Sequence, residues 1–137
     1  MQLGWRWATW CEVMVKILIA DDSSFARNML KKYLNEGGFP DILFSTDGKE
    51  TLKMFKKHKP DIILLDVAMG DGADGIEALK EIKKLSPETK VIMITGLAEE
   101  LLKDKAVSEN ADGYLLKPFK KEQVIRALGF VLGYIPG

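Results

Sequence analysis

Three aspartates follow two aliphatic runs of the chain, and together they could hold a cation. Asp21 and Asp22 end the run Val15–Ala20, and Asp66 ends the run Ile62–Leu65. A buried parallel strand reads as such a run, and its carboxyl end lies where open α/β sheets bind ligands. Three carboxylates placed there by adjacent strands repel one another unless a proton or a cation enters. Their oxygens suit a hard metal such as Mg²⁺.

Two further residues at expected strand ends carry groups suited to a phosphoryl ligand. Thr95 offers a hydroxyl, and Lys117, before Pro118, offers an ammonium. An aspartate among such groups can act as a nucleophile towards phosphorus, while a metal, a lysine and a hydroxyl neutralise charge on the equatorial oxygens. Alone, each residue is most often a turn, strand-end or surface residue. Their joint occurrence favours phosphoryl chemistry.

Short aliphatic runs alternate with helical patterns along the chain, and this order must position the site. The expected strands are Val15–Ala20, Ile42–Ser45, Asp61–Leu65, Lys90–Ile94 and Gly113–Leu116. The expected helices follow Ser24, run near Lys49–His58, pass through Ile76 to Leu85, run near Ala98–Ser108 and begin after Pro118. Strict alternation predicts one doubly wound α/β domain, a five-stranded parallel sheet with helices on both faces.

The first helix has the clearest local signals. Ser24 is the expected N-cap, and Gly37-Gly38 the expected C-terminal stop. Apolar side chains recur on one helical face from Phe25 to Leu34, through Met29, Leu30 and Tyr33. These positions therefore predict one apolar face of a helix.

Composition excludes several classes of protein. Among 137 residues, Lys plus Arg and Asp plus Glu both total 20, so no global field favours nucleic acid or an anionic membrane. No apolar stretch approaches the roughly 20 residues needed to span a bilayer. The single cysteine, Cys11, excludes an internal disulfide and fits a cytoplasmic protein.

The first 13 residues differ from the rest of the chain. All three tryptophans fall there, without the apolar core of a signal peptide. We expect residues 1–13 to be an extension outside the fold and residues 14–137 to form the domain. An amphipathic anchor for a partner is the alternative, because exposed aromatic side chains often mark interfaces.

Four segments resemble those of response-regulator receiver domains of the stand-alone chemotaxis-regulator (CheY-like) type. These are ILIADDSSFAR, PDIILLDVAMGDGADGIEALK, VIMITG and ADGYLLKPF, in family order from Met14 to about Gly133. The resemblance implies a sheet in the flavodoxin-like order 2-1-3-4-5 and Mg²⁺-dependent (or Mn²⁺-dependent) phosphorylation of Asp66 by a sensor histidine kinase. Such a protein is a phosphoacceptor that assists its own phosphorylation and dephosphorylation, not an enzyme.

The resemblance also implies a role for each matching residue. Asp22 would bind the metal directly, Asp21 through water, and Asp66 as both ligand and phosphoacceptor. A third protein oxygen would come from the backbone carbonyl of Ala68. The remaining roles are those of Thr95 and Lys117 as phosphoryl-binding residues, Thr95 and Tyr114 as switch residues, and Lys117-Pro118 as a cis peptide.

Two segments depart from the family pattern. The loop Met69–Gly75 lacks the usual proline, is rich in glycine and is one residue longer, so we expect it to be more mobile. Ala68 and Leu97 are apolar at positions that influence dephosphorylation in the family. Since neither side chain could orient an attacking water, we expect slow intrinsic dephosphorylation.

The implied output is a protein partner bound by the fourth helix, fifth strand and fifth helix, in chemotaxis or another phosphorelay. The protein would be a monomer or a weak phosphorylation-dependent dimer, without direct contact to nucleic acid or insertion into membrane. Three alternatives are a non-phosphorylated docking module, an FMN-binding flavodoxin-like protein and a Mg²⁺-dependent phosphatase. The Asp21-Asp22 pair argues against FMN, because it repels a phosphate without metal. A phosphatase usually has a second acid where this chain has Ala68.

Overall fold

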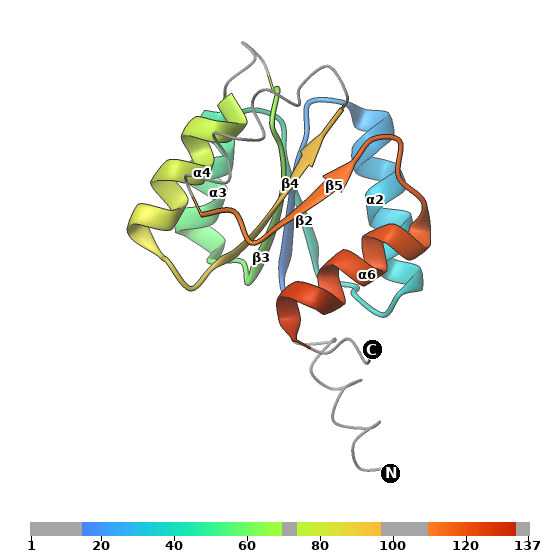
Figure 1. Cartoon of the computed structure of the whole chain (residues 1–137). Helices are drawn as coiled ribbons and strands as arrows, with labels where there is room; N and C mark the ends of the chain where they lie inside the picture. Colours follow the sequence, from blue (N-terminus) through green and yellow to red (C-terminus); the bar gives the residue numbers. More distant parts are fainter. Residues whose placement is uncertain (1–14, 70–73, 97–109, 134–137) are drawn as a thin grey trace.

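The computed structural model describes residues 15–69, 74–96 and 110–133, which form one parallel sheet between two layers of helices (Figure 1). The five strands lie in the order β2-β1-β3-β4-β5. In Figure 1, α3 and α4 cover one face of the sheet, and α2 and α6 cover the other. The predicted doubly wound α/β fold and its strand order are therefore confirmed.

All five predicted strands are present, with ends shifted by no more than two residues. They are β1 (Ile17–Ala20), β2 (Ile42–Ser45), β3 (Ile62–Asp66), β4 (Lys90–Thr95) and β5 (Gly113–Leu116). The helices are α2 (Ser24–Glu36), α3 (Gly48–His58), α4 (Asp74–Leu85) and α6 (Lys121–Leu132). The helix expected near Ala98–Ser108 and the extension 1–13 lie outside the described residues, as do residues 70–73 of the long loop.

The central strands are buried on both faces, which explains why they read as near-continuous aliphatic runs. Successive side chains of a strand point to opposite faces. In β3, Ile63 and Leu65 therefore join the core beneath α3 and α4, while Ile62 and Leu64 join the core beneath α2 and α6. All four side chains have no solvent exposure. These two cores fix the register of the strands, and with it the residues that end them.

The predicted N-cap of α2 is wrong, and its buried face differs in part from the predicted apolar face. The N-cap is Ser23, whose extended backbone lets its hydroxyl accept a hydrogen bond from the amide of Ala26 at 3.2 Å. The side chains buried by α2 are Ala26, Leu30 and Leu34, which repeat every four residues. Phe25 lies about 100° around the helix from Ala26 and is 71% exposed. The predicted stop at Gly37 is confirmed as the C-cap.

At the amino end of the strands, Lys83 and Asp112 form a network in which each charged group has close partners. Lys83, in the last turn of α4, forms a 2.7 Å ion pair with Asp112 and donates to the carbonyls of Thr89 and Pro87 at 2.6 and 3.2 Å. Asp112 also accepts a hydrogen bond from the amide of Val91 at 2.8 Å. The network ties α4 to the starts of β4 and β5.

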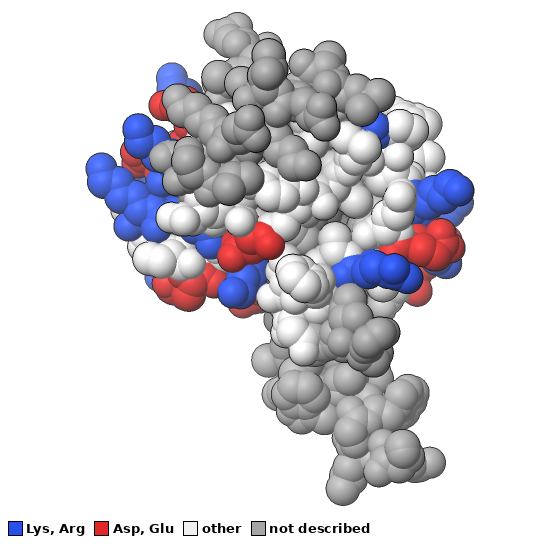
Figure 2. Space-filling model, in the orientation of Figure 1, with Lys and Arg blue, Asp and Glu red and all other residues white. Residues whose placement is uncertain are grey.

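Positive and negative side chains are mixed on the face of the molecule in view in Figure 2. Figure 2 shows Lys and Arg side chains interspersed with Asp and Glu on the flanks of the face in view. This agrees with the balanced composition of the chain. Among the described residues, no helix is long and apolar enough to cross a membrane.

Candidate metal and phosphoryl site

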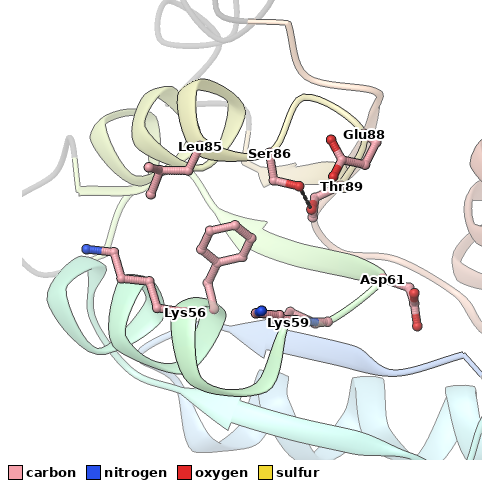
Figure 3. A pocket seen from close by; sticks show the side chains of 9 residues that line it. Lys56, Lys59, Asp61, Leu85, Ser86, Glu88 and Thr89 are labelled. Carbon is pink, nitrogen blue, oxygen red and sulfur yellow. Dashed lines mark hydrogen bonds between the residues drawn. The ribbon is translucent and has the colours of Figure 1, made fainter.

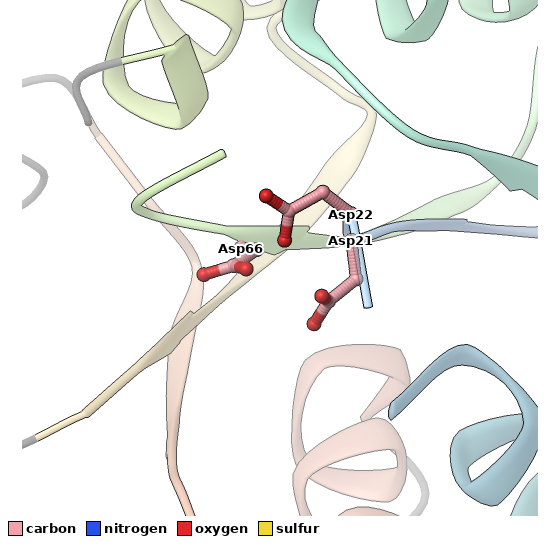
Figure 4. A group of neighbouring side chains, drawn as sticks. All are labelled: Asp21, Asp22 and Asp66. Carbon is pink, nitrogen blue, oxygen red and sulfur yellow. The ribbon is translucent and has the colours of Figure 1, made fainter. Parts of the chain in front are cut away.

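The acidic residues meet because β1 and β3 are parallel neighbours that end together. Ala20 pairs with Leu65 in the register, so Asp21 and Asp66 emerge side by side at the carboxyl edge of the sheet. Asp21, Asp22 and Asp66 each offer a carboxylate oxygen, and these oxygens lie within 4.8 Å of one another (Figure 4). Asp21 and Asp66 are buried, whereas Asp22 is exposed. The structure thus brings together the three acids named from sequence.

Asp21 is held through both its backbone and its side chain. Its amide donates to the carbonyl of Ser45 at 3.1 Å, and its carbonyl accepts from Nη1 of Arg27 at 2.8 Å. Its Oδ1 accepts from the amide of Ser23 at 2.9 Å. Its Oδ2 lies 3.3 Å from Nζ of Lys117 but accepts no hydrogen bond from the described residues. A buried carboxylate oxygen in this state has capacity for a further ligand.

Lys117 lies between the two buried acids. Its Nζ is 3.3 Å from Oδ2 of Asp21 and 3.3 Å from Oδ2 of Asp66. Its amide donates to the carbonyl of Thr95 at 2.7 Å. The peptide bond to Pro118 is cis, as predicted. One ammonium is therefore shared by two carboxylates.

This shared charge does not compensate Asp66 fully. Burial, together with the negative charge of Asp21, raises the pKa of Asp66 from 3.8 to about 7, although Lys117 and the amide of Ala68 oppose the shift. For Lys117, burial lowers the pKa, but attraction to Asp66 and Asp21 outweighs it, so the pKa is raised. The single positive charge of Lys117 is therefore too little to balance the acids of the site.

These features fit a divalent cation. The donors are all oxygen, as Mg²⁺ and Mn²⁺ require, and Oδ2 of Asp21 is buried without a hydrogen bond. Asp21, Asp22 and Asp66 could hold the ion. Ala68 follows Asp66 closely enough for its amide to donate to Oδ1 of that residue at 3.2 Å. The metal role of its carbonyl stays a prediction.

The two residues named as switch elements lie on the neighbouring strands. Thr95 ends β4 directly after Ile94, the register partner of Asp66, and is buried. Its hydroxyl donates to the carbonyl of Gly96 at 3.1 Å. Tyr114 lies in β5, partly buried against the core beneath α3 and α4. Their phosphoryl-binding and switch roles stay predictions, and Leu97 lies outside the described residues.

The structure adds two residues that the sequence interpretation missed. A Cβ on Gly75 would lie 2.0 Å from the carbonyl oxygen of Asp66 and 2.7 Å from that of Val67, so only glycine fits there. The sequence signal for this requirement was a glycine directly after Asp74, at the second position of α4. Arg27 reaches back from α2 to Asp21. No sequence pattern distinguished it from an ordinary surface cation.

The site is distinct from a hollow at the opposite edge of the sheet. This hollow, of about 610 Å³, lies between the C-terminal ends of α3 and α4. Figure 3 shows Lys56, Leu85 and Glu88 among the residues that line it. It contains none of the residues predicted to act on a phosphoryl group.

Comparisons with known proteins agree with the geometry. Residues 17–129 match the response regulator receiver domain family. The chain is 39% identical over 117 residues to the chemotaxis protein CheY of Halobacterium salinarum and 34% identical over 116 residues to that of Thermotoga maritima. Both matches cover 85% of this chain and 96% of the relative. The crystal structure of the receiver domain of NtrX from Brucella abortus superposes with a TM-score of 0.80 at 27% identity, covering 88% of this chain and all of that one.

Proposed function

Because the chain belongs to the response regulator receiver domain family, we propose that it is a phosphorylation-controlled switch whose phosphoacceptor is Asp66. The observation that carries the proposal is the position of the Asp66 carboxylate, buried at a strand end beside a second acid and 3.3 Å from Lys117. A structural ion pair would need one acid for one lysine. Here one lysine faces two buried acids, and a third acid lies beside them, which favours a site that binds a cation and accepts a phosphoryl group.

In the proposed reaction, a carboxylate oxygen of Asp66 attacks the phosphorus of a phosphohistidine on a sensor kinase. An O–P bond forms and the N–P bond breaks, and the imidazole leaves with the electron pair and takes a proton from solvent. Lys117 and the hydroxyl of Thr95 bind the phosphoryl oxygens, where fixed donors lower the barrier. Mg²⁺ or Mn²⁺ supplies further positive charge to these oxygens. The protein is not an enzyme in this scheme, since it is itself modified.

The proposed output surface lies on β5 and α6, with the segment near 98–108. In its described part, a hollow of about 440 Å³ is lined by Tyr114, Leu116, Arg126 and Phe130, among others. Leu116 and Phe130 are 49% and 72% exposed and line the same hollow, and exposed apolar side chains grouped in this way often mark interaction sites. Because Tyr114 borders the hollow, a change at the site could reach an effector protein by shifting conformers already populated.

The remaining parts of the proposal concern the whole chain. We propose that residues 14–137 act as a cytoplasmic single-domain regulator, with residues 1–13 outside the fold, in chemotaxis or another phosphorelay. We expect a monomer or a weak dimer that forms on phosphorylation, without direct contact to nucleic acid. Slow intrinsic dephosphorylation, expected from Ala68 and Leu97, belongs to the same proposal.

Intact-mass measurement after incubation with acetyl phosphate and Mg²⁺ tests the proposal. We expect one phosphoryl adduct on the wild-type protein and none on Asp66→Asn. An exposed acid far from the site provides the control, and Glu81→Gln should accept the phosphoryl group as the wild type does. An adduct of equal yield on Asp66→Asn would contradict the assignment. No adduct on the wild type would favour the alternative of a docking module.

A further inference from the structure

Besides Lys117, a second basic residue, Arg27, contacts the acidic loop formed by Asp21 and Asp22. Its Nη1 donates to the carbonyl oxygen of Asp21 at 2.8 Å, across six residues of chain. Its guanidinium also lies over the ring of Phe44, 5.6 Å from the centroid. The side chain thus spans from α2 to the edge strand β2 and contacts the acidic loop on the way. It is partly buried, which strengthens both contacts relative to water.

The contacts of Arg27 and Asp21 close a small ring of interactions. Phe44 precedes Ser45, and the carbonyl of Ser45 accepts the amide proton of Asp21 at 3.1 Å. Arg27 therefore binds the carbonyl of Asp21 and also packs on Phe44. Phe44 is the neighbour of Ser45, which accepts the hydrogen bond from the amide of Asp21. The peptide group before Asp21 is thus held by Ser45 and the one after it by Arg27, which limits rotation of the backbone at Asp21. The direction of the Asp21 carboxylate, and of the Asp22 amide that follows, is set by this ring.

We propose that Arg27 is a positioning residue for the cation site, holding the Asp21–Asp22 backbone so that both carboxylates converge with Asp66. The inference rests on the proposed function, because it assumes that these acids bind a divalent cation. Arg27 needs no contact with the ion. Groups that orient metal ligands typically change metal affinity by about 10- to 100-fold when they are removed.

Lys31 offers a matched control on the same helix. It lies one turn after Arg27, and its Nζ is 5.9 Å from the centroid of the same Phe44 ring. The structure records no hydrogen bond from Lys31 to Asp21 within the described residues. Removing either cation lowers the positive charge near the acidic cluster by one unit. By charge alone, both removals should tighten binding of a divalent cation slightly. If Arg27 positions the acids, its removal should instead weaken binding of the cation, whereas removal of Lys31 should not.

The test is calorimetric titration of Mg²⁺ into the unphosphorylated full chain, for the wild type, Arg27→Met, Arg27→Lys and Lys31→Met. We expect the dissociation constant of Arg27→Met to rise about tenfold, and that of Lys31→Met to stay equal or fall. Arg27→Lys keeps the charge and one donor, so we expect partial recovery. Urea unfolding of each variant without metal shows whether the fold is retained. If Arg27→Met does not fold, the comparison of Arg27→Lys with Lys31→Met decides, because only the former should weaken binding.

Two results would overturn the inference while leaving the proposed function intact. One is wild-type affinity for Mg²⁺ in Arg27→Met. The other is an equal weakening in Lys31→Met, which would mean that any loss on this face of α2 has the same effect. Absence of Mg²⁺ binding in the wild type would instead overturn the proposed function, and the inference with it.

Discussion

At the amino edge of the sheet Lys83 pairs with Asp112 at 2.7 Å and donates to two carbonyls, whereas at the carboxyl edge Lys117 lies 3.3 Å from each of two acids. In the first network each charge has close partners of opposite sign. In the second, one ammonium serves two buried carboxylates, and Oδ2 of Asp21 accepts no hydrogen bond from the described residues. The difference indicates that the amino edge stabilises the fold, while the carboxyl edge retains capacity for ligands.

The largest expected effect comes from breaking the amino-edge network. Lys83→Met leaves Asp112 without its counter-ion in a largely buried setting, so we expect the free energy of unfolding to fall by about 3 kcal/mol. Urea unfolding measures this. The neighbouring exposed residue gives the control, since Lys84→Met should change stability by less than about 0.5 kcal/mol. Equal effects of the two substitutions would show that the Lys83 network is not structural.

Next in size is the effect of replacing Gly75, which packs against the backbone of the proposed phosphoacceptor, Asp66. In Gly75→Ala, the new methyl group must displace the backbone of Asp66 and Val67, at a cost of about 2 kcal/mol in unfolding free energy. We also expect slower formation of the acetyl-phosphate adduct, because the carboxylate moves with its backbone. Gly113→Ala is the control, since its Cβ would meet only Val131 and Ile92 at 3.4 Å or more. An unchanged adduct rate in Gly75→Ala would contradict this reading.

A bound cation should stabilise the domain through the carboxyl edge alone, independently of the network at the amino edge. At ten times its dissociation constant, Mg²⁺ should raise the free energy of unfolding of the wild type by about 1.4 kcal/mol. Lys83→Met, although less stable, should gain the same increment, because its altered network lies at the opposite edge. A much smaller increment in Lys83→Met would show that the two edges are coupled.

The smallest expected effect is a pH dependence confined to the carboxyl edge. The pKa of Asp66 is raised from 3.8 to about 7, so between these values the folded chain binds more protons than the unfolded chain. Without metal, the extra proton bound by folded Asp66 stabilises the fold fully below pH 4. This stabilisation is lost as the pH rises towards 7. Asp66→Asn removes this loss but also the attraction to Lys117, so we expect it to be more stable at pH 7 by only on the order of 1 kcal/mol. Parallel stability–pH curves for the two proteins would contradict the raised pKa.

The sequence predicted the strands well because their residues are buried on both faces. A run such as Ile62 to Leu65 has few other structures available, and its end at Asp66 follows from the register. The cluster of Asp21, Asp22 and Asp66 then follows from adjacency of β1 and β3. Local choices between similar neighbours were harder. Either Ser23 or Ser24 could have capped α2, and periodicity alone did not show that the packed face runs through Ala26 and leaves Phe25 exposed.

Contacts between distant segments could not be predicted from patterns. The bond from Arg27 to the carbonyl of Asp21 depends on a side-chain conformation that no periodicity encodes. The same holds for Gly75, whose requirement arises from the approach of α4 to the backbone after β3. Sequence indicated which acidic groups meet at the carboxyl edge, and only the fold shows what orients them.

The unequal numbers of acids and lysines at the carboxyl edge also imply an order of events. Three carboxylates and one ammonium carry a formal charge of −2 when ionised. An approaching phosphodonor is itself an anion, so the empty edge repels it by long-range Coulomb forces. Once a divalent cation is held, the edge is electroneutral and this barrier to encounter disappears. Phosphorylation should therefore show saturation with Mg²⁺ concentration, and raising the ionic strength should accelerate it only when Mg²⁺ is scarce.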